Sequence, residues 1–221
     1  MNSTERDERI LQKLLSLQPG KIDLGLDRMK AAIRSFCPQL SFQIVTIAGT
    51  NGKGSTAAFL ESLLLAHGRQ VGVYTSPHLV HVRERFRIGG TPIAHDALEE
   101  EVEHLFSWLE SASIHLTYFE AVTLLALRLF EREGVDVAVM EVGLGGRLDA
   151  TNALEPDITI ITSLALDHTE WLGDTLEQIA WEKGGITRGG IPLITGMEPQ
   201  WIPHALKNRE ASRFFSACGI H

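Results

Sequence analysis

A glycine-rich stretch at residues 48–56, A-G-T-N-G-K-G-S-T, carries the residue types that hold phosphate groups in proteins. It follows a strand-like run at 42–47, rich in β-branched residues, and precedes a run with apolar residues at helical spacing. Glycine lets the backbone turn its N–H groups towards an anion, and a following helix adds the positive end of its dipole. Lys53 supplies a mobile charge, and Ser55 or Thr56 supplies a hydroxyl for Mg²⁺. The sequence therefore predicts a phosphate-binding loop.

The match to the strict phosphate-loop pattern, G-x-x-x-x-G-K-[ST], is imperfect. Ile47 stands where the first glycine would fall, and Gly54 separates Lys53 from Ser55. The alternative is an ordinary glycine-rich turn between a strand and a helix. We prefer the phosphate loop because the strand, glycines, lysine, hydroxyls and helix coincide in one stretch.

Three further polar residues lie at or near the ends of predicted strands. They are Ser76 after a strand over 70–75, Glu141 after one over 135–140, and His168 near the end of one over 157–166. In a parallel sheet the carboxyl ends of the strands meet at one edge, and ligands bind there. We therefore expect these residues and the glycine-rich loop to form a single site.

The chemistry of these side chains suits a metal bound together with phosphate. Mg²⁺ prefers hard oxygen ligands, which Glu141 and the hydroxyls of Ser55 and Ser76 can provide. His168 would be an unusual Mg²⁺ ligand because imidazole favours softer metals, and it could instead be a hydrogen-bonded histidine at a strand end. Glu141 could instead cap a helix or pair with Arg147.

Strands that alternate with helical segments predict an α/β fold, with a mostly parallel sheet flanked by helices. One more strand is expected over 191–195. Helices are expected at 4–17, 27–36 with Asp27 as its cap, 57–66, 93–109, 117–133, 174–182 and 203–212. Thr117 and Glu120 have the spacing of a capping box.

The segment 80–90 has no clear period and is expected to be a long loop or a short hairpin. It carries Arg83, Arg85 and Arg87. Long loops beside a phosphate site are often functional, so these arginines either act at the site or form a solvated strand face.

The composition fits one sizeable core in a chain of 221 residues that is 44% hydrophobic. The formal charge is 20 − 28 = −8 with no basic run, which argues against nucleic acid or a membrane surface as a partner. The two cysteines, Cys37 and Cys218, have no metal spacing. The first nine residues are polar, so no secretory signal is seen and the cytosol is expected.

Six motifs occur in an order that makes a family resemblance specific. They are A-G-T-N-G-K-G-S-T at 48–56, Y-T-S-P-H-L at 74–79, T-Y-F-E at 117–120, E-V-G-L-G-G-R-L-D-A-T-N at 141–152, L-D-H-T at 166–169 and E-K-G-G-I at 182–186. The motif I-D-L-G-L at 22–26 adds to them. From about residue 20 to 195 the chain resembles the folylpolyglutamate synthases, and within them the bacterial bifunctional dihydrofolate synthase/folylpolyglutamate synthases of the Mur-ligase superfamily.

The resemblance implies a P-loop NTPase-like, Mur-ligase-type ATP-binding domain over residues 1–221, and we expect a monomer. It also implies ATP-dependent amide synthesis with two Mg²⁺ ions. ATP phosphorylates a carboxylate, the amine of L-glutamate attacks the acyl phosphate, and phosphate leaves. The implied carboxylate substrates are 7,8-dihydropteroate, which gives dihydrofolate, and folates, which gain further glutamates.

The resemblance also assigns roles to individual residues. ATP phosphates would be bound by Thr50, Asn51, Gly52, Lys53, Gly54 and Ser55. Mg²⁺ positions match Ser55, Ser76, Glu141 and His168. Lys183, which alone would read as a surface lysine at a helix end, matches a lysine that the family carbamylates to hold the second Mg²⁺. The pterin substrate would contact Asp23, Leu24, Gly25, Thr117, Tyr118, Phe119, Glu120, Leu148, Asp149 and Ala150.

Family members are about twice as long and carry a second α/β domain that closes over the nucleotide. The sequence is therefore expected to be an N-terminal part of such an enzyme, with its domain incomplete at the C-terminal end. Three other functions stay open: a catalytically silent nucleotide-binding module, a Mur-type peptidoglycan ligase, and a plain phosphotransferase that needs no amine. The T-Y-F-E and G-L-G-G-R-L-D-A-T-N motifs argue against the peptidoglycan ligase.

Overall fold

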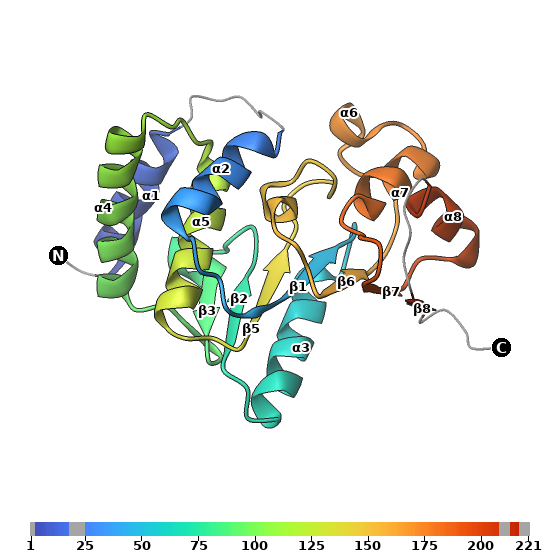
Figure 1. Ribbon diagram of the computed structural model, residues 1–221, viewed down its shortest axis with the longest axis horizontal. Helices are drawn as coiled ribbons and strands as arrows, with labels where there is room; N and C mark the ends of the chain where they lie inside the picture. Colours follow the sequence, from blue (N-terminus) through green and yellow to red (C-terminus); the bar gives the residue numbers. More distant parts are fainter. Residues whose placement is uncertain (1–2, 18–24, 208–212, 217–221) are drawn as a thin grey trace.

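The computed structural model describes residues 3–17, 25–207 and 213–216 of the chain (Figure 1). These residues build an eight-stranded sheet with the strand order β4-β3-β2-β5-β1-β6-β7-β8. The strands are β1 (Gln43–Ala48), β2 (Val71–Tyr74), β3 (Phe86–Ile88), β4 (Thr91–Pro92), β5 (Val137–Glu141), β6 (Ile158–Ile161), β7 (Pro192–Thr195) and β8 (Arg213–Ser216).

Six neighbouring strands, from β2 through to β8 at the far edge, run parallel to one another. Only β3 and β4 run antiparallel, as a hairpin beside β2. The predicted α/β fold with a mostly parallel sheet is therefore confirmed, and so is the hairpin alternative for residues 80–90. All six parallel strands end at the same edge of the sheet, which fixes where a ligand site can form.

Helices cover both faces of the sheet (Figure 1). One layer covers the β2, β3 and β5 side, a single helix packs on the opposite face, and short helices gather near β6 and β7. The first layer is α1 (Ser3–Leu15), α2 (Asp27–Phe36), α4 (His95–Ala112) and α5 (Tyr118–Arg132); the opposite face has α3 (Lys53–Ala66); the short group is α6 (Thr169–Leu172), α7 (Leu176–Gly184) and α8 (Ile202–Ala205).

Helix α5 is the centre of the largest core. Its residues from Ala121 to Leu127 are fully or almost fully buried, together with Leu129 and Phe130. A second core lies under α3, where Val45, Ile47 and neighbours on β2 and β5 are buried. These two cores fix the sheet between them and hold its carboxyl edge in place.

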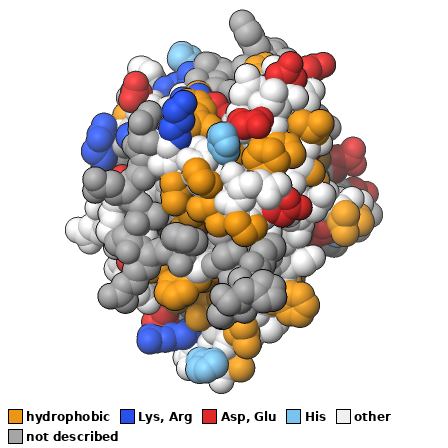
Figure 2. Space-filling model, turned by 90° about the vertical axis from the view of Figure 1, so that its right-hand side faces the viewer, with side chains coloured by type: hydrophobic (Ala, Val, Ile, Leu, Met, Phe, Trp, Pro, Cys, Tyr) orange, Lys and Arg blue, Asp and Glu red, His pale blue; other side chains and the backbone are white. Residues whose placement is uncertain are grey.

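The sheet face beside α3 is less covered towards its β8 edge. Ile194 on β7 and Phe215 on β8 are register partners, and they are 39% and 56% exposed. Figure 2 shows the molecule from the side of its β8 edge, where several hydrophobic side chains lie at the surface. No helix in the described part of the chain is both long and apolar enough to span a bilayer.

Several predicted boundaries were wrong. Of the helix expected over 203–212, the described residues up to 207 form only the short α8, and strand β8 was not predicted. The strand expected over 157–166 ends at Ile161, because its neighbours β1 and β7 have their last paired residues there. Asp27 is not a helix cap but the first helical residue, after Leu26. Helix α3 begins at Lys53, four residues earlier than predicted.

The packing of α5 on β2 gives a direct test of the core. A methyl group on Gly72 would lie 2.6–2.8 Å from three ring carbons of Phe130, which is too close for any real contact. We expect Gly72→Ala to lower the free energy of unfolding by roughly 1–3 kcal/mol, measured by urea denaturation.

The matched control is Gly25→Ala, because nothing among the described residues lies within 4 Å of the methyl group that it would add. Its free energy of unfolding should stay within about 0.5 kcal/mol of the parent chain. Equal effects of the two substitutions would contradict the close approach of β2 and α5.

Candidate functional site

The glycine-rich loop joins β1 to α3 and is shaped by two residues with positive φ. Gly49 has φ 148° and Gly52, which precedes the helix, has φ 82°. Lys53 begins α3, so the first backbone N–H groups of this helix have no partner within the helix and face the loop. Gly54 lies inside the helix, where a methyl group would be 3.8 Å from the Glu141 carboxylate. This arrangement can bind an anion at a helix N-terminus.

The loop is fixed by the segment that follows β6. Thr50 and Ala165 exchange two hydrogen bonds, each 3.1 Å long, between the threonine hydroxyl and the alanine backbone. Ser163 accepts from the Asn51 backbone N–H at 2.9 Å, and both Thr162 and Ser163 donate to the Asn51 carbonyl. A methyl group on Gly49 would overlap the Thr162 hydroxyl. The predicted phosphate residues are thus held in a preformed loop.

Lys53 and Glu141 are two charged groups at this loop. The Lys53 ammonium donates to the carbonyl of Gly49 at 3.0 Å, within its own loop. Glu141 is 4% exposed and accepts a hydrogen bond from the Ser76 N–H at 3.2 Å. Burial raises the pKa of Glu141, while the Ser76 bond, Lys53 and Arg85 oppose the rise. Glu141 makes no ion pair with Arg147 in the described structure, so that alternative was wrong.

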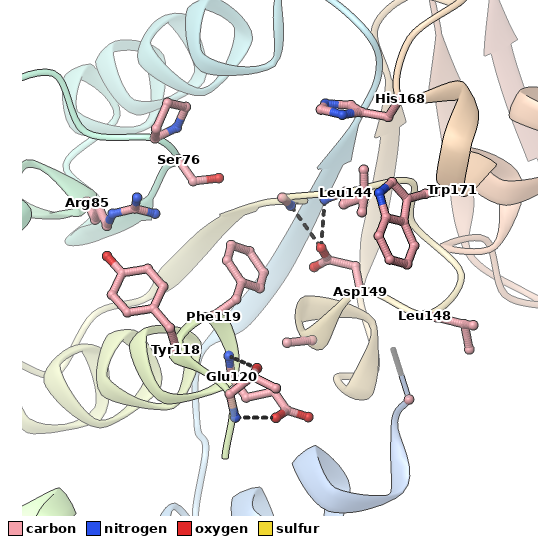
Figure 3. A pocket seen from close by; sticks show the side chains of 15 residues that line it. Ser76, Arg85, Tyr118, Phe119, Glu120, Leu144, Leu148, Asp149, His168 and Trp171 are labelled. Carbon is pink, nitrogen blue, oxygen red and sulfur yellow. Dashed lines mark hydrogen bonds between the residues drawn. The ribbon is translucent and has the colours of Figure 1, made fainter. Parts of the chain in front are cut away.

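A cavity of about 420 Å³ opens beside the loop (Figure 3). It brings together residues from five separate parts of the chain, and most of the predicted substrate residues are among them. Its lining is Gly25, Ser76, Pro77, Arg85, Thr117, Tyr118, Phe119, Glu120, Gly143, Leu144, Leu148, Asp149, Ala150, His168 and Trp171. The predicted residues Asp23 and Leu24 lie outside the described residues.

One wall of the cavity is the N-terminus of α5. The Glu120 N–H donates to the Thr117 hydroxyl at 3.2 Å, and the Thr117 N–H donates to the Glu120 carboxylate at 2.8 Å, so the predicted capping box is confirmed. The buried Glu120 carboxylate also pairs with Arg28 of α2 at 3.1 Å. This ion pair joins two helices at the cavity wall. Arg28 was not predicted from the sequence.

The turn after β5 forms a second wall and is organised by Asp149. This buried carboxylate accepts from the N–H groups of Gly143, Leu144 and Thr151 and from the Thr151 hydroxyl, at 2.7–3.0 Å. Burial raises the pKa of Asp149, and these hydrogen bonds oppose the rise. With four donors satisfied within its own turn, Asp149 shapes the wall that Leu148 and Ala150 complete.

The C-terminal end of α7, which carries Lys183, packs closely against the backbone of the turn after β5. A methyl group on Gly185 would lie 2.3 Å from Arg147 Cα, and one on Gly146 would lie 2.9 Å from the Glu182 carbonyl. The Arg147 guanidinium also pairs with Glu182 at 2.8 Å. Glycines in both motifs therefore let the helix end touch the turn after β5.

Lys183 is 3% exposed, so it is not a surface lysine. Burial lowers the pKa of its ammonium group to about 8; Lys53 also lowers it, and Asp167 partly opposes the change. Lys183 thus lies within electrostatic reach of Lys53 in the glycine-rich loop. A lysine with this pKa is partly neutral near pH 7–8 and can act as a nucleophile towards CO₂.

His168 lies seven residues beyond the end of β6, with φ 48°, immediately before α6. Its side chain is 57% exposed, 3.7 Å from Asp167, and Figure 3 shows it at the rim of the cavity across from Ser76. No cluster of three His, Cys, Asp or Glu side chains that could hold a metal occurs in the described residues. The available set of one buried carboxylate, hydroxyls and one imidazole fits Mg²⁺ that also binds phosphate oxygens and water.

The arginines of the η1–β3 segment, a 3-10 turn (Val82–Arg85) followed by β3, do not form a solvated face. Arg83 lies 3.5 Å from the Asp7 carboxylate, and Arg87 pairs with the buried Glu61. Arg85 is 7% exposed and lines the cavity. In the sequence, arginine occurs at every second position from 83 to 87, but this spacing does not show that Arg85 is the one that lines the cavity. Trp171 was missed because nothing in its local sequence marks a cavity wall, and Leu144 was missed although it lies inside the motif at 141–152.

Comparison with known proteins gives one family. A family model, the Mur ligase middle domain, matches residues 47–194. The dihydrofolate synthase/folylpolyglutamate synthase of Escherichia coli is 48% identical over 193 residues, which are 86% of this chain and 44% of that protein. Its namesake from Haemophilus influenzae is 47% identical over 84% of this chain and 41% of that protein. The chain spans less than half the length of these curated relatives.

Solved structures agree with the curated relatives. E. coli FolC in complex with DHPP and ADP has a TM-score of 0.86 at 43% identity, over 95% of this chain and 50% of that one. The bifunctional folylpolyglutamate synthase/dihydrofolate synthase of Yersinia pestis, complexed with AMPPNP and Mn ion, has a TM-score of 0.83 at 44% identity, over 95% of this chain and 51% of that one.

The lowered pKa of Lys183 predicts how stability changes with pH. Below pH 8 both folded and unfolded chains hold the proton on Lys183; between about 8 and its ordinary 10.5 only the unfolded chain does. The free energy of unfolding of the parent chain, relative to Lys183→Met, should therefore rise across this window, by up to about 1.4 kcal/mol per pH unit. Urea denaturation in CO₂-free buffers measures it. A difference that stays flat between pH 8 and 10.5 would contradict the burial of a titrating lysine.

Proposed function

The chain belongs to the Mur ligase family, and from this membership we propose that it is the nucleotide- and acceptor-binding part of an ATP-dependent amide ligase. The resemblance to the dihydrofolate synthase/folylpolyglutamate synthases is confirmed by relatives and solved structures that cover most of the chain. The proposed reaction adds L-glutamate to 7,8-dihydropteroate and to folates through an acyl phosphate.

One observation carries this proposal. The cavity that contains the predicted pterin residues opens beside the glycine-rich loop, and Ser76 lies between the two. The Ser76 side chain lines the cavity while its N–H contacts Glu141, whose carboxylate reaches Gly54 of the loop. An acceptor carboxylate in this cavity would therefore meet the terminal phosphate of ATP at Ser76.

We assign the phosphate side to the residues of the loop and its surroundings. Thr50 to Ser55 would bind the ATP phosphates through backbone N–H groups, with Lys53 turning from the Gly49 carbonyl to the phosphate. Ser55, Ser76, Glu141 and His168 would hold two Mg²⁺ ions, which neutralise phosphate charge when they are bound. Lys183, carbamylated, would provide a further carboxylate for the second ion.

We assign the acceptor side to the walls of the cavity. Phe119, Leu148 and Ala150 offer apolar surface for a pterin ring, and Gly25, Thr117 and Tyr118 line the same space. Glu120 and Asp149 are fully engaged in hydrogen bonds that shape these walls, so their contribution is to hold the walls in place. The proposed assembly is a monomer in the cytosol that acts on small molecules.

The relatives' nucleotide-bound structures support ATP as the phosphate donor, since one holds ADP and another AMPPNP with Mn. The direct test is ADP release by the purified chain with ATP, Mg²⁺ and 7,8-dihydropteroate, with and without glutamate. Release that rises with glutamate and yields dihydrofolate supports the ligase. Nucleotide-dependent thermal stabilisation without release would instead support a silent nucleotide-binding module. Release that is independent of glutamate, with a phosphorylated product, would overturn the ligase in favour of a phosphotransferase.

Lys53→Ala tests the phosphate side. The change removes a charge-assisted donor aimed at developing negative charge, so ADP release should fall at least about 100-fold. The rise in melting temperature caused by AMPPNP and Mg²⁺ should also shrink.

The control is Lys13→Ala, which removes the same charge from α1, where Lys13 pairs with Glu103 on the surface. This variant should keep both the rate and the AMPPNP effect. A Lys53→Ala variant that kept most of its ADP release would rule out the phosphate role.

A further inference from the structure

Arg85 is a buried cation that forms no ion pair and no hydrogen bond with a carboxylate among the described residues, although its charge acts on Glu141 from a distance. Its neighbours in sequence have such partners, because Arg83 contacts Asp7 and Arg87 pairs with Glu61. Arg85 is as buried as these carboxylates, at 7% exposure, yet it lines the cavity rather than a core. Burying an unpaired guanidinium costs free energy, so its retention in a cavity points to an anionic ligand.

Two contacts hold the Arg85 guanidinium in a defined orientation. Its Nε donates to His78 Nδ1 at 2.8 Å, and its Cζ lies 5.5 Å from the centre of the Tyr118 ring. His78 must be neutral to accept this bond, and burial followed by the charge of Arg85 lowers its pKa accordingly. The terminal amino groups of Arg85 have no hydrogen-bond partner in the described structure. They are free to bind both oxygens of a carboxylate.

Tyr118 adds a second unused polar group at the same place. Its hydroxyl is buried and has no hydrogen-bond partner in the described part of the chain. Figure 3 shows Arg85 on the cavity wall between Ser76 and Tyr118, with the tyrosine hydroxyl on the Arg85 side. The pair therefore lies between the proposed reacting end, at Ser76, and the proposed pterin walls.

The proposed acceptors differ in the number of carboxylates that they bring to this space. Dihydropteroate has one, which reacts. The terminal glutamate of a folate has two, so that an α-carboxylate remains beside the side-chain carboxylate that reacts. The α-carboxylate enters a partly buried cavity and needs a cationic partner there.

We propose that Arg85, supported by Tyr118, binds the non-reacting α-carboxylate of glutamate-tailed acceptors and so determines that folates are accepted. This specificity rests on the proposed function, and it adds a residue that discriminates between the two acceptor classes. Dihydropteroate, with its single carboxylate at the phosphate loop, does not use Arg85.

The test compares two ligands that differ only in this group. They are 7,8-dihydrofolate and the analogue in which 4-aminobutyrate replaces glutamate, and 7,8-dihydropteroate is the reference. Their binding to the 221-residue chain with ADP and Mg²⁺ is measured by titration calorimetry. The parent chain should bind dihydrofolate roughly 10- to 100-fold more tightly than the analogue, as a charged hydrogen-bonded pair does.

Arg85→Gln should bind dihydrofolate and the analogue equally, while its affinity for dihydropteroate changes less than about threefold. Arg85→Lys keeps the charge but not the planar pair of donors, so it should retain only part of the discrimination. If Arg85→Gln fails to fold, the Arg85→Lys variant provides the test in its place. Arg69→Gln is the matched control, because Arg69 is exposed before β2 and the substitution removes the same charge. This control should discriminate like the parent chain.

Two results would overturn this inference alone. One is discrimination that survives in Arg85→Gln or is absent from the parent chain. The other is an equal loss of dihydropteroate and dihydrofolate affinity in a folded variant, which would place Arg85 at the reacting carboxylate. If the parent chain bound none of the three ligands, the proposed function itself would be refuted, and the role of Arg85 with it.

Discussion

The site depends on charged side chains that are buried away from water but do not form ion pairs with one another. Lys183 and Arg85 are buried cations with no acidic hydrogen-bonding partner in the described structure, and Glu141 is a buried carboxylate held by a single backbone N–H. Burial shifts the pKa of Lys183 down and that of Glu141 up, as desolvation requires. Each such group lowers the stability of the free protein, and the cores on both faces of the sheet must offset that cost.

The walls of the site are rigid because their own polar groups are satisfied locally. Asp149 accepts four hydrogen bonds within one turn, and Glu120 closes a capping box and pairs with Arg28. Glycine allows these walls to approach one another: a methyl group on Gly143 would lie 2.4 Å from the Phe119 ring. The structure therefore separates groups that shape the cavity from groups that are left unpaired for ligands. The groups that shape the cavity and the groups left for ligands are equally buried, and they differ in how many hydrogen bonds they form.

Local sequence patterns predicted most of the fold, because strands and helices are marked by periodicity and by caps that lie within a few residues. The capping box at Thr117 and the glycine-rich loop at 48–56 are of this kind. The burial of Lys183 could not be predicted from its neighbours in sequence, since the end of α7 packs against a distant turn, where Gly146 approaches the Glu182 carbonyl and Gly185 approaches Arg147. Strand β8 is an edge strand with one partner, β7, and its local sequence does not distinguish it from a helix or loop. The family motifs contain most of the residues that line the cavity, but they do not show which of these have polar groups left for ligands and which hold the walls.

The sheet itself sets the distance between the two halves of the proposed reaction. The phosphate loop follows β1, and the acceptor wall with Glu141 follows β5, which pairs directly with β1 through Ile47 and Glu141. Neighbouring strands lie about 4.8 Å apart, so the two halves are adjacent through backbone hydrogen bonds that do not depend on ligands. A phosphate on the loop and a carboxylate in the cavity would then be neighbours as soon as both are bound. In the proposed reaction, the approach of phosphate and carboxylate is therefore already built into the register of two strands.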